Sequence, residues 1–186
     1  MTPLNVLLAD DEPLSSMAMR SQLEALGHHV VVHVRNGQDA VDLARCYPLD
    51  IAIVDYRMPD LTGFAAATRI FRDRPTALLL VSGYAESDTN ADERPPAYHY
   101  LRKPADLNAL ELAIEHAVAR FNDWLQHNAD SDEVRRKYDD ARVIQAAHQR
   151  LSDRMGNREA CRTLITRSRE TGSDLLAAAR AVLDET

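Results

Sequence analysis

Three segments of the sequence that are typical of strands are followed by charged residues: the first by Asp10 and Asp11, the second by Asp55 and the third by Lys103. Carboxylates brought together in one place repel one another and raise each other's pKa, unless a divalent cation and a lysine ammonium share the pocket. Hard oxygen ligands with room left for water are the set that Mg²⁺ prefers. These residue types therefore predict a Mg²⁺ site that also contains a lysine.

The element that must position Asp55 is a short central strand. Ile51–Val54 is a run of Ile, Ala and Val followed at once by a turn containing Pro59 and Gly63, a pattern typical of a buried parallel strand. Asp55 then stands at the carboxyl end of the strand. In an open α/β sheet ligands bind at that edge, so Asp55 is expected to serve a site.

The first 105 residues alternate strand and helix, which predicts an α/β fold with a doubly wound, five-stranded parallel sheet. The expected strands are Asn5–Ala9, His29–Val34, Ile51–Val54, Ala77–Val81 and Tyr98–Leu101. Helices are expected to begin near Pro13, Gly37, Phe64, Ala85 and Asp106. The stretch from Ala85 to Pro96 has no apolar stripe and ends in two prolines, so it is predicted to be short, mobile or partly unwound.

From Leu4 to about Arg120 the chain resembles the receiver domain of bacterial two-component response regulators, which has a flavodoxin-like fold. The resemblance rests on the order and spacing of Asp10-Asp11, the block VDYRMPDLTG, the strand LLLVSGY and the strand YLRKP. It implies that Asp55 is the phosphoacceptor, that Lys103 and Ser82 contact the phosphoryl group, and that Tyr100 is an aromatic switch. It also implies that Mg²⁺ is held by Asp10, Asp11, Asp55 and the backbone carbonyl of Arg57.

The same resemblance implies a cognate sensor histidine kinase or phosphotransfer protein as partner. The expected chemistry is self-phosphorylation of Asp55 from a phosphodonor and slow autodephosphorylation, with no further enzymatic activity. A phosphatase-like hydrolase is the rival, because aspartyl-phosphate enzymes share an Asp nucleophile with Mg²⁺, Ser and Lys. Those enzymes resemble one another in a second Asp two residues after the nucleophile, and here that position is Arg57.

Composition divides the chain in two. Residues 1–132 carry 11 Lys and Arg against 20 Asp and Glu, a balance of −9, whereas residues 133–186 carry 11 against 9, a balance of +2. Nothing in the sequence is apolar for long enough to span a membrane or reads as a signal peptide, so a cytoplasmic protein is expected. Cys46 and Cys161 form no metal-binding spacing and are expected to be reduced thiols without a function.

The last helix of the receiver is predicted to continue beyond it. An apolar seam at spacings of three and four is formed by Leu107, Leu110, Ile114, Ala117, Phe121 and Trp124. Phe121, Trp124 and Leu125 come too late to reach the sheet, so we assign them to a coiled-coil or interdomain contact, with a homodimer favoured. One long helix through Asn128 is predicted, and the alternative is a hinge with a new helix capped by Asp130 and Glu133.

Beyond this helix we expect a small all-α domain of three helices. The expected domains are a receiver over 1–120, a helical linker or coiled coil over 121–133, and a three-helix domain over 134–186. Asn157 is predicted to cap the second helix of the small domain, and Thr171-Gly172-Ser173 to break the chain before the third.

From about Arg142 to Leu183 the tail resembles the ANTAR module, the three-helix RNA-binding domain of transcription antiterminators. The apolar and small positions Ile144, Ala147, Leu151, Gly156, Ala160, Leu164 and Ala179 carry this resemblance. It implies a phosphorylation-controlled antiterminator that binds an RNA hairpin. Guanidinium groups bind phosphates and stack on bases, so the expected RNA contacts are His148, Arg150, Arg154, Arg158, Arg162, Arg167 and Arg169. The alternative is a signalling adaptor whose tail only dimerises or binds a protein.

Overall fold

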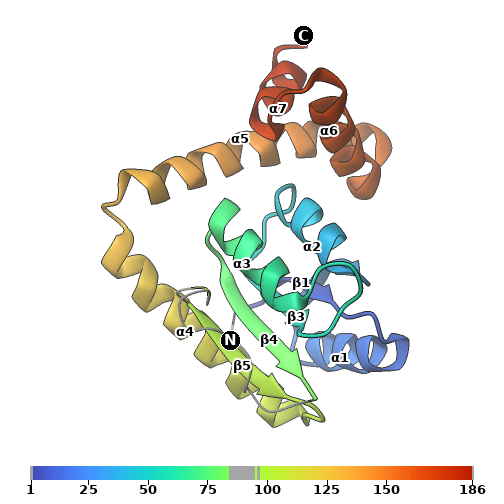
Figure 1. The fold of residues 1–186 in the computed structure, drawn as a ribbon, viewed down its shortest axis with the longest axis vertical. Coiled ribbons are helices and arrows are strands. Elements are labelled where there is room, and N and C mark those ends of the chain that lie inside the picture. Colours follow the sequence, from blue (N-terminus) through green and yellow to red (C-terminus); the bar gives the residue numbers. More distant parts are fainter. Residues whose placement is uncertain (1, 84–94, 96, 186) are drawn as a thin grey trace.

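A computed structural model describes residues 2–83, 95 and 97–185. Its centre is a five-stranded sheet in the order β2-β1-β3-β4-β5, with every neighbouring pair parallel (Figure 1). The strands are β1 (Asn5–Ala9), β2 (His29–Val34), β3 (Ile51–Asp55), β4 (Ala77–Ser82) and β5 (Tyr98–Arg102). This confirms the doubly wound α/β fold, with the first two strands at the bounds that the sequence predicts.

Helices cover both faces of the sheet. The receiver helices are α1 (Pro13–Ala25), α2 (Gly37–Ala44), α3 (Gly63–Asp73) and α4 (Leu107–Asn128). One apolar core lies between the sheet and α2 with α3, and a second lies between the sheet and α1 with α4. The expectation of a short or unwound segment over 85–96 falls, apart from Pro95, outside the described residues.

Gly63 fixes how α3 approaches the end of β3. The Gly63 amide donates to the Tyr56 carbonyl at 3.0 Å, and a Cβ at Gly63 would lie 1.7 Å from the carbonyl oxygen of Asp55. Thr62 caps the helix by accepting from the Ala65 amide. A residue without a side chain is therefore needed here for the loop to close beneath Asp55.

The prediction of one continuous helix through Asn128 is wrong. α4 ends at Asn128, and a new helix, α5 (Asp132–Met155), begins after Ser131 and runs in a different direction (Figure 1). The side chains of His127 and Asn128 bond to carbonyls in the last turn of α4, and Arg135 bonds to the Ala129 carbonyl from the other side of the break. The Arg135 bond, together with a bond from the Ser131 amide to the Asn128 carbonyl at 3.0 Å, satisfies carbonyls that a continuing helix would have used.

Phe121 and Trp124 reach the receiver core, contrary to the sequence-based assignment. Trp124 packs edge-on against Phe71 of α3 with ring centroids 4.8 Å apart, and Phe121 meets the same ring at 6.4 Å. Both are half-buried. The apolar seam of α4 therefore packs on the receiver of its own chain, because α4 is long enough to extend past the end of the sheet and contact α3.

The tail is a three-helix unit with its own core. α6 (Asn157–Thr171) and α7 (Leu175–Asp184) fold against the second half of α5. Six side chains form the buried centre: Ala147, Leu151, Ala160, Leu164, Ala179 and Val182. Asn157 is the first residue of α6 rather than its cap, since the preceding Gly156 takes that position with a φ of 87°.

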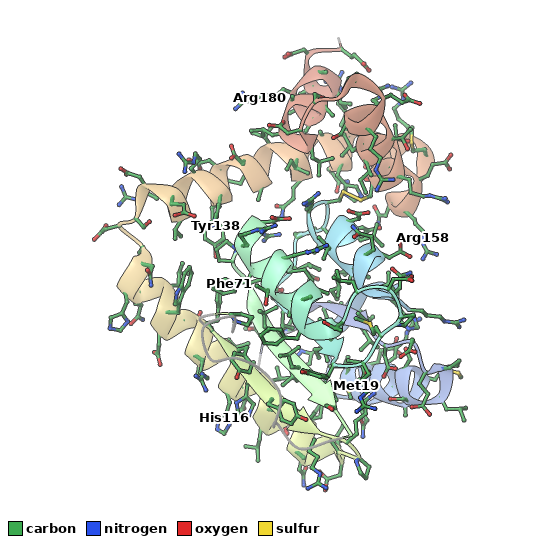
Figure 2. All side chains as sticks on the ribbon, viewed as in Figure 1. Met19, Phe71, His116, Tyr138, Arg158 and Arg180 are labelled. Atoms are coloured by element: carbon green, nitrogen blue, oxygen red, sulfur yellow. A yellow bond between two sulfur atoms is a disulfide. The ribbon has the colours of Figure 1, made fainter. Side chains whose placement is uncertain are left out.

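The tail lies against the receiver. The Tyr138 hydroxyl of α5 donates to the Pro75 carbonyl at 3.1 Å, just before β4 (Figure 2). Cys46, just after α2, forms a disulfide with Cys161 of α6, so the expectation of two free thiols is wrong in this structure. Within the described part of the chain, no helix combines the length and the apolar character needed to cross a membrane.

Candidate functional site

The sheet topology brings the predicted site residues to one edge. Asp10 follows β1 and Asp55 ends β3, which are neighbours at the point where the strand order reverses. Ser82 ends β4, and Lys103 follows β5 directly. Open parallel sheets bind ligands at this switch point because the loops diverge there and leave a crevice.

Lys103 joins two buried carboxylates. Its Nζ lies 2.7 Å from Oδ1 of Asp55 and 2.9 Å from Oδ2 of Asp10. Asp10 is 2% exposed and Asp55 9% exposed, so both charges are largely removed from water. The second oxygen of Asp55 accepts from the Arg57 amide at 3.0 Å. The Asp55 carboxylate is thus held in one orientation, with one oxygen facing a cation.

Asp10 is held by two groups that the sequence analysis missed. The Ser15 hydroxyl donates to Oδ2 of Asp10 at 2.7 Å, and the Glu12 amide donates to Oδ1 at 2.9 Å. Ser15 lies in the first turn of α1, two residues after Pro13 starts the helix. The sequence signal that could have identified Ser15 is a polar residue in the first helical turn after an acid at the end of a strand.

The position of Lys103 is set by the backbone of the sheet. Its amide donates to the Ser82 carbonyl at 2.8 Å, which continues the pairing of β4 with β5 to the sheet edge. The Gln22 side chain donates to the Ala105 carbonyl and connects the loop after β5 to α1. The Lys103–Pro104 peptide bond is cis.

Burial and charge shift the pKa of both partners. Burial raises the pKa of Asp55 above its ordinary value, and the Lys103 ammonium opposes that shift only in part. Burial alone would lower the pKa of Lys103, but its bonds to Asp55 and Asp10 outweigh burial and raise it. Lys103 therefore stays charged, and a second cation at Asp55 would favour its ionised form.

These residues line one open pocket of about 650 Å³. Its wall includes the buried Asp10, Asp55 and Ser82, and also Asp11 and Arg57. Carboxylate oxygens beside an open space suit a hard divalent cation, so the donor chemistry fits the Mg²⁺ predicted from the sequence. In the described residues no three His, Cys, Asp or Glu side chains gather around a single point. Asp11 is exposed, while Asp10 and Asp55 both bind Lys103.

Tyr100, the predicted switch residue, lies on β5 opposite Leu80 of β4. It is half-buried and packs against the core on the side of α2 and α3. Tyr100 therefore lies on the strand that leads to Lys103, but it does not line the pocket.

The structure divides the predicted RNA contacts. His148 is 4% exposed, bonds to the Asn157 carbonyl and makes a tilted ring contact with Tyr47 of the receiver, so it is enclosed in this arrangement. Arg150 bonds to the carbonyls of Leu183 and Glu185, and Arg167 forms a 2.6 Å ion pair with Glu185. The remaining arginines are exposed: Arg154, Arg158, Arg162 and Arg169 (Arg158 in Figure 2).

A family model described as the response regulator receiver domain matches residues 6–115. The chain belongs to this family. Receiver domains are phospho-accepting signalling domains, and the fold and the pocket agree with that membership. The match ends within α4, so α5, α6 and α7 lie outside it.

Among relatives, the transcriptional regulatory protein PdtaR of Mycobacterium tuberculosis is 29% identical over 158 residues, covering 84% of this chain and 77% of PdtaR. Protein PilH of Pseudomonas aeruginosa is 33% identical over 118 residues, covering 61% of this chain and 97% of PilH. The receiver domain of NarL from Mycobacterium tuberculosis has a TM-score of 0.53 at 26% identity, and covers 62% of this chain and 96% of that structure. The similarity to PdtaR is longer than the receiver match and therefore includes part of the tail.

Proposed function

We propose that this chain is a response regulator whose phosphorylation on Asp55 controls an RNA-binding, antiterminating tail. The observation that carries the proposal is the buried Asp55 carboxylate held 2.7 Å from Lys103 in an open pocket at the sheet edge. A nucleophilic oxygen, a fixed cation and an open approach are what transfer of a phosphoryl group to a carboxylate requires.

In the proposed reaction an Asp55 oxygen attacks the phosphorus of a phosphodonor, and the donor is a phosphohistidine of a kinase or phosphotransfer protein. A new O–P bond forms as the bond to the leaving group breaks, and the leaving group takes up a proton. Lys103 and Ser82 contact the phosphoryl oxygens. Mg²⁺, when bound by Asp10, Asp11, Asp55 and the Arg57 carbonyl, neutralises charge on the transferred group. Hydrolysis of the product is slow because Arg57 occupies the position where related phosphatases carry a second Asp.

For the tail, two features support RNA binding. The relative aligned over 158 residues is a transcriptional regulatory protein, and this alignment extends into the helical region. Three arginines, Arg158, Arg162 and Arg167, line a groove of about 630 Å³ on α6 with two threonines and two glutamates, so basic residues outnumber acidic ones there. Guanidinium and hydroxyl groups arranged along a helix suit phosphate oxygens, and arginine also stacks on unpaired bases.

Binding to RNA is tested with the full chain and a labelled pool of short hairpins with randomised loops. Arg158→Ala with Arg162→Ala is expected to weaken retention and to flatten the dependence on salt, because each phosphate contact to a single strand contributes about 0.7 to the slope. The control is Arg69→Ala with Arg72→Ala, two exposed arginines of α3 that remove the same charge. Absence of retention at low salt, with and without a phosphodonor, contradicts an RNA-binding tail.

A signalling adaptor without nucleic acid remains the second candidate. Two of the predicted RNA contacts are engaged within the protein, which favours this candidate: His148 is buried, and Arg169 forms an ion pair with Asp42 of α2. Either function is proposed for a cytoplasmic protein. A homodimer stays a prediction, and Phe121 and Trp124, which suggested it, already contact Phe71 of the same chain.

A further inference from the structure

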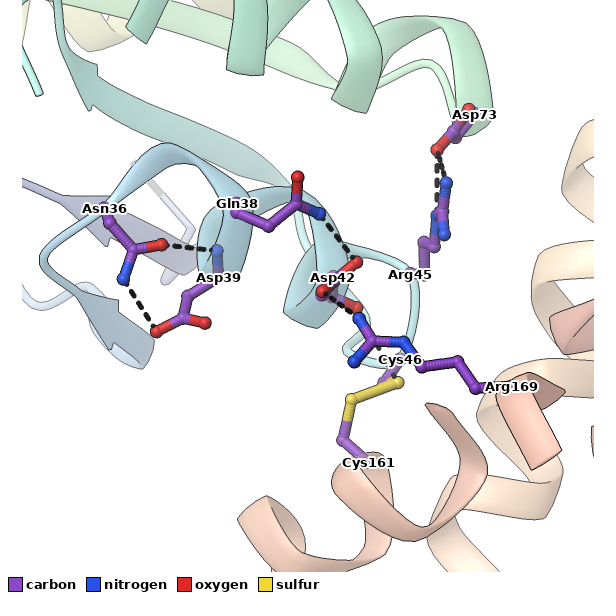
Figure 3. A network of polar contacts seen from close by, with 9 residues as sticks. All are labelled: Asn36, Gln38, Asp39, Asp42, Arg45, Cys46, Asp73, Cys161 and Arg169. Atoms are coloured by element: carbon purple, nitrogen blue, oxygen red, sulfur yellow. Dashed lines mark hydrogen bonds and ion pairs between the residues drawn. A yellow bond between two sulfur atoms is a disulfide. The ribbon is translucent and has the colours of Figure 1, made fainter. Parts of the chain in front are cut away.

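The contact between α2 and α6 is covalent. Cys46 and Cys161 are separated by 115 residues in the chain and form a disulfide that joins the receiver to the tail (Figure 3). Both cysteines are fully buried. They are the two cysteines of the sequence, so this pair is the chain's entire thiol chemistry.

The noncovalent contacts beside the disulfide are modest. Arg169 of α6 lies 3.2 Å from Asp42 of α2, but the arginine is 69% exposed, and such an ion pair contributes little (Figure 3). The rings of Tyr47 and His148 are in tilted contact with centroids 4.8 Å apart, and Ile165 packs against the receiver core. Farther along, the Tyr138 hydroxyl bonds to the Pro75 carbonyl. Contacts of this kind between two parts of one chain open and close reversibly when no covalent bond joins them.

The docked arrangement also places acids opposite the basic face of α6. Asp39 and Asp42 of α2 line one cavity with three arginines, Arg158, Arg162 and Arg169. The Asp42 carboxylate pairs with Arg169, one of the donors that an RNA phosphate would use. The negative charge of the two acids beside Arg158 and Arg162 also opposes a phosphate at these exposed arginines, so docking disfavours binding of a polyanion.

We propose that the Cys46–Cys161 pair is a redox-controlled lock: when oxidised it holds the tail on the receiver, and when reduced it lets α6 leave α2. Reduction breaks the Sγ–Sγ bond, adds two electrons and two protons to give two thiols, and converts an external dithiol to its disulfide. This inference rests on the proposed function for its consequence, since undocking frees Arg169 and removes the two α2 acids from beside Arg158 and Arg162. In a reducing compartment such a disulfide is transient and suited to sensing.

Burial of both sulfurs couples the redox state to docking. A reductant reaches the disulfide only when α6 has moved from α2, and an intact disulfide opposes that movement. By linkage, any ligand that opens the interface promotes reduction, and reduction promotes binding of that ligand. Polyanion binding to the arginines is one such event.

The lock is tested with the full chain, oxidised in air or treated with dithiothreitol, and with the Cys46→Ser/Cys161→Ser variant as control. Mass spectrometry after alkylation is expected to find the two cysteines linked in the oxidised protein and free after reduction. Amide hydrogen exchange over 42–47 and 158–165 is expected to rise at least about fivefold on reduction, in the range of ordinary coupling between sites. The double variant is expected to exchange like the reduced protein and to ignore dithiothreitol.

Two results overturn the lock: both cysteines alkylated in protein treated with diamide, or equal exchange in the oxidised and reduced protein. RNA retention then separates the lock from the proposed function. The reduced protein is expected to bind the hairpin pool at least about fivefold more tightly than the oxidised protein. If reduction speeds exchange but neither state retains RNA, the lock is supported and the antiterminator function is contradicted. If both states bind RNA equally, the disulfide does not control RNA binding by the tail.

Discussion

Lys103 and Asp55 meet across the end of β4: their charged atoms lie 2.7 Å apart although Lys103 follows β5 and Asp55 ends β3, two strands that are not neighbours in the sheet. The ion pair spans the strand that ends in Ser82. It therefore connects three strand ends at the edge where the pocket opens. A substitution at Lys103 should therefore change the pKa of Asp55, the stability of the receiver and the rate of phosphorylation.

Lys103→Ala is expected to destabilise the protein at pH 7. Two buried carboxylates, Asp10 and Asp55, would lose their shared cation, and removal of one partner from a buried pair costs about 3–5 kcal/mol. Because Lys103 is 20% exposed, we expect about 2 kcal/mol in chemical denaturation. Arg102→Ala, which removes an exposed neighbouring charge, is the control and should be close to neutral. Equal stability of the two variants would contradict the ion pair.

The stability lost by Lys103→Ala, measured against the wild type, should become smaller as the pH falls from 7 toward 5. Burial raises the pKa of Asp55 in the folded protein, and the variant lacks the lysine that opposes this shift. The folded state then binds more protons than the unfolded state between the two pKa values, so its unfolding free energy increases as protons are added. Denaturation curves at several pH values measure this. The comparison with the wild type cancels the effect of His28 and His33, whose pKa burial lowers in both proteins. A difference that grows over this interval would show that Asp55 is not buried as described.

Gly63→Ala is expected to disturb both the fold and the site. The added Cβ would lie 1.7 Å from the Asp55 carbonyl oxygen, so the backbone of β3 or α3 must move, at a cost of about 1–3 kcal/mol. Phosphorylation should slow as well, because Asp55 moves with its backbone. Gly83→Ala is the matched control for stability, since a Cβ there meets nothing within 4 Å. A Gly63→Ala protein of unchanged thermal stability would show that the loop does not close as described.

Trp124→Ala tests whether the α4 seam serves the receiver or a dimer. Its ring packs on Phe71 of the same chain, so the loss of this half-buried aromatic should cost about 2 kcal/mol and leave the mass in solution unchanged. Asn122→Ala, exposed on the same helix, is the control. Light scattering gives the mass and thermal unfolding gives the stability. A dimer that dissociates on this substitution would restore the coiled-coil interpretation.

The sheet and the pocket were predictable because their signals are local. Ile51–Val54 is buried on both faces and therefore uninterrupted by polar residues, and Asp55 follows it directly, so the strand and the site residue are marked together. Lys103 likewise directly follows a strand, β5. Ser15 was missed because its role depends on how α1 leaves β1, which spacing alone does not fix.

Most of the wrong predictions concern contacts between segments that are distant in the sequence. The disulfide joins residues that are 115 apart, and no spacing rule relates them. The break before Asp132 is accompanied by bonds of Ser131 and Arg135 to the carbonyls of Asn128 and Ala129, whereas apolar periodicity indicates only that both flanks are helical. His148 is polar in sequence, but its burial follows from the tail docking on Tyr47.

Whether Asp55 accepts a phosphoryl group is measured by labelling with acetyl phosphate and Mg²⁺, followed by borohydride trapping and mass spectrometry. The expected result is one modified residue, Asp55, with labelling abolished in Asp55→Asn and retained in Asp60→Asn, an exposed acid of the same loop. Modification of another residue, or wild-type labelling of Asp55→Asn, would contradict the account.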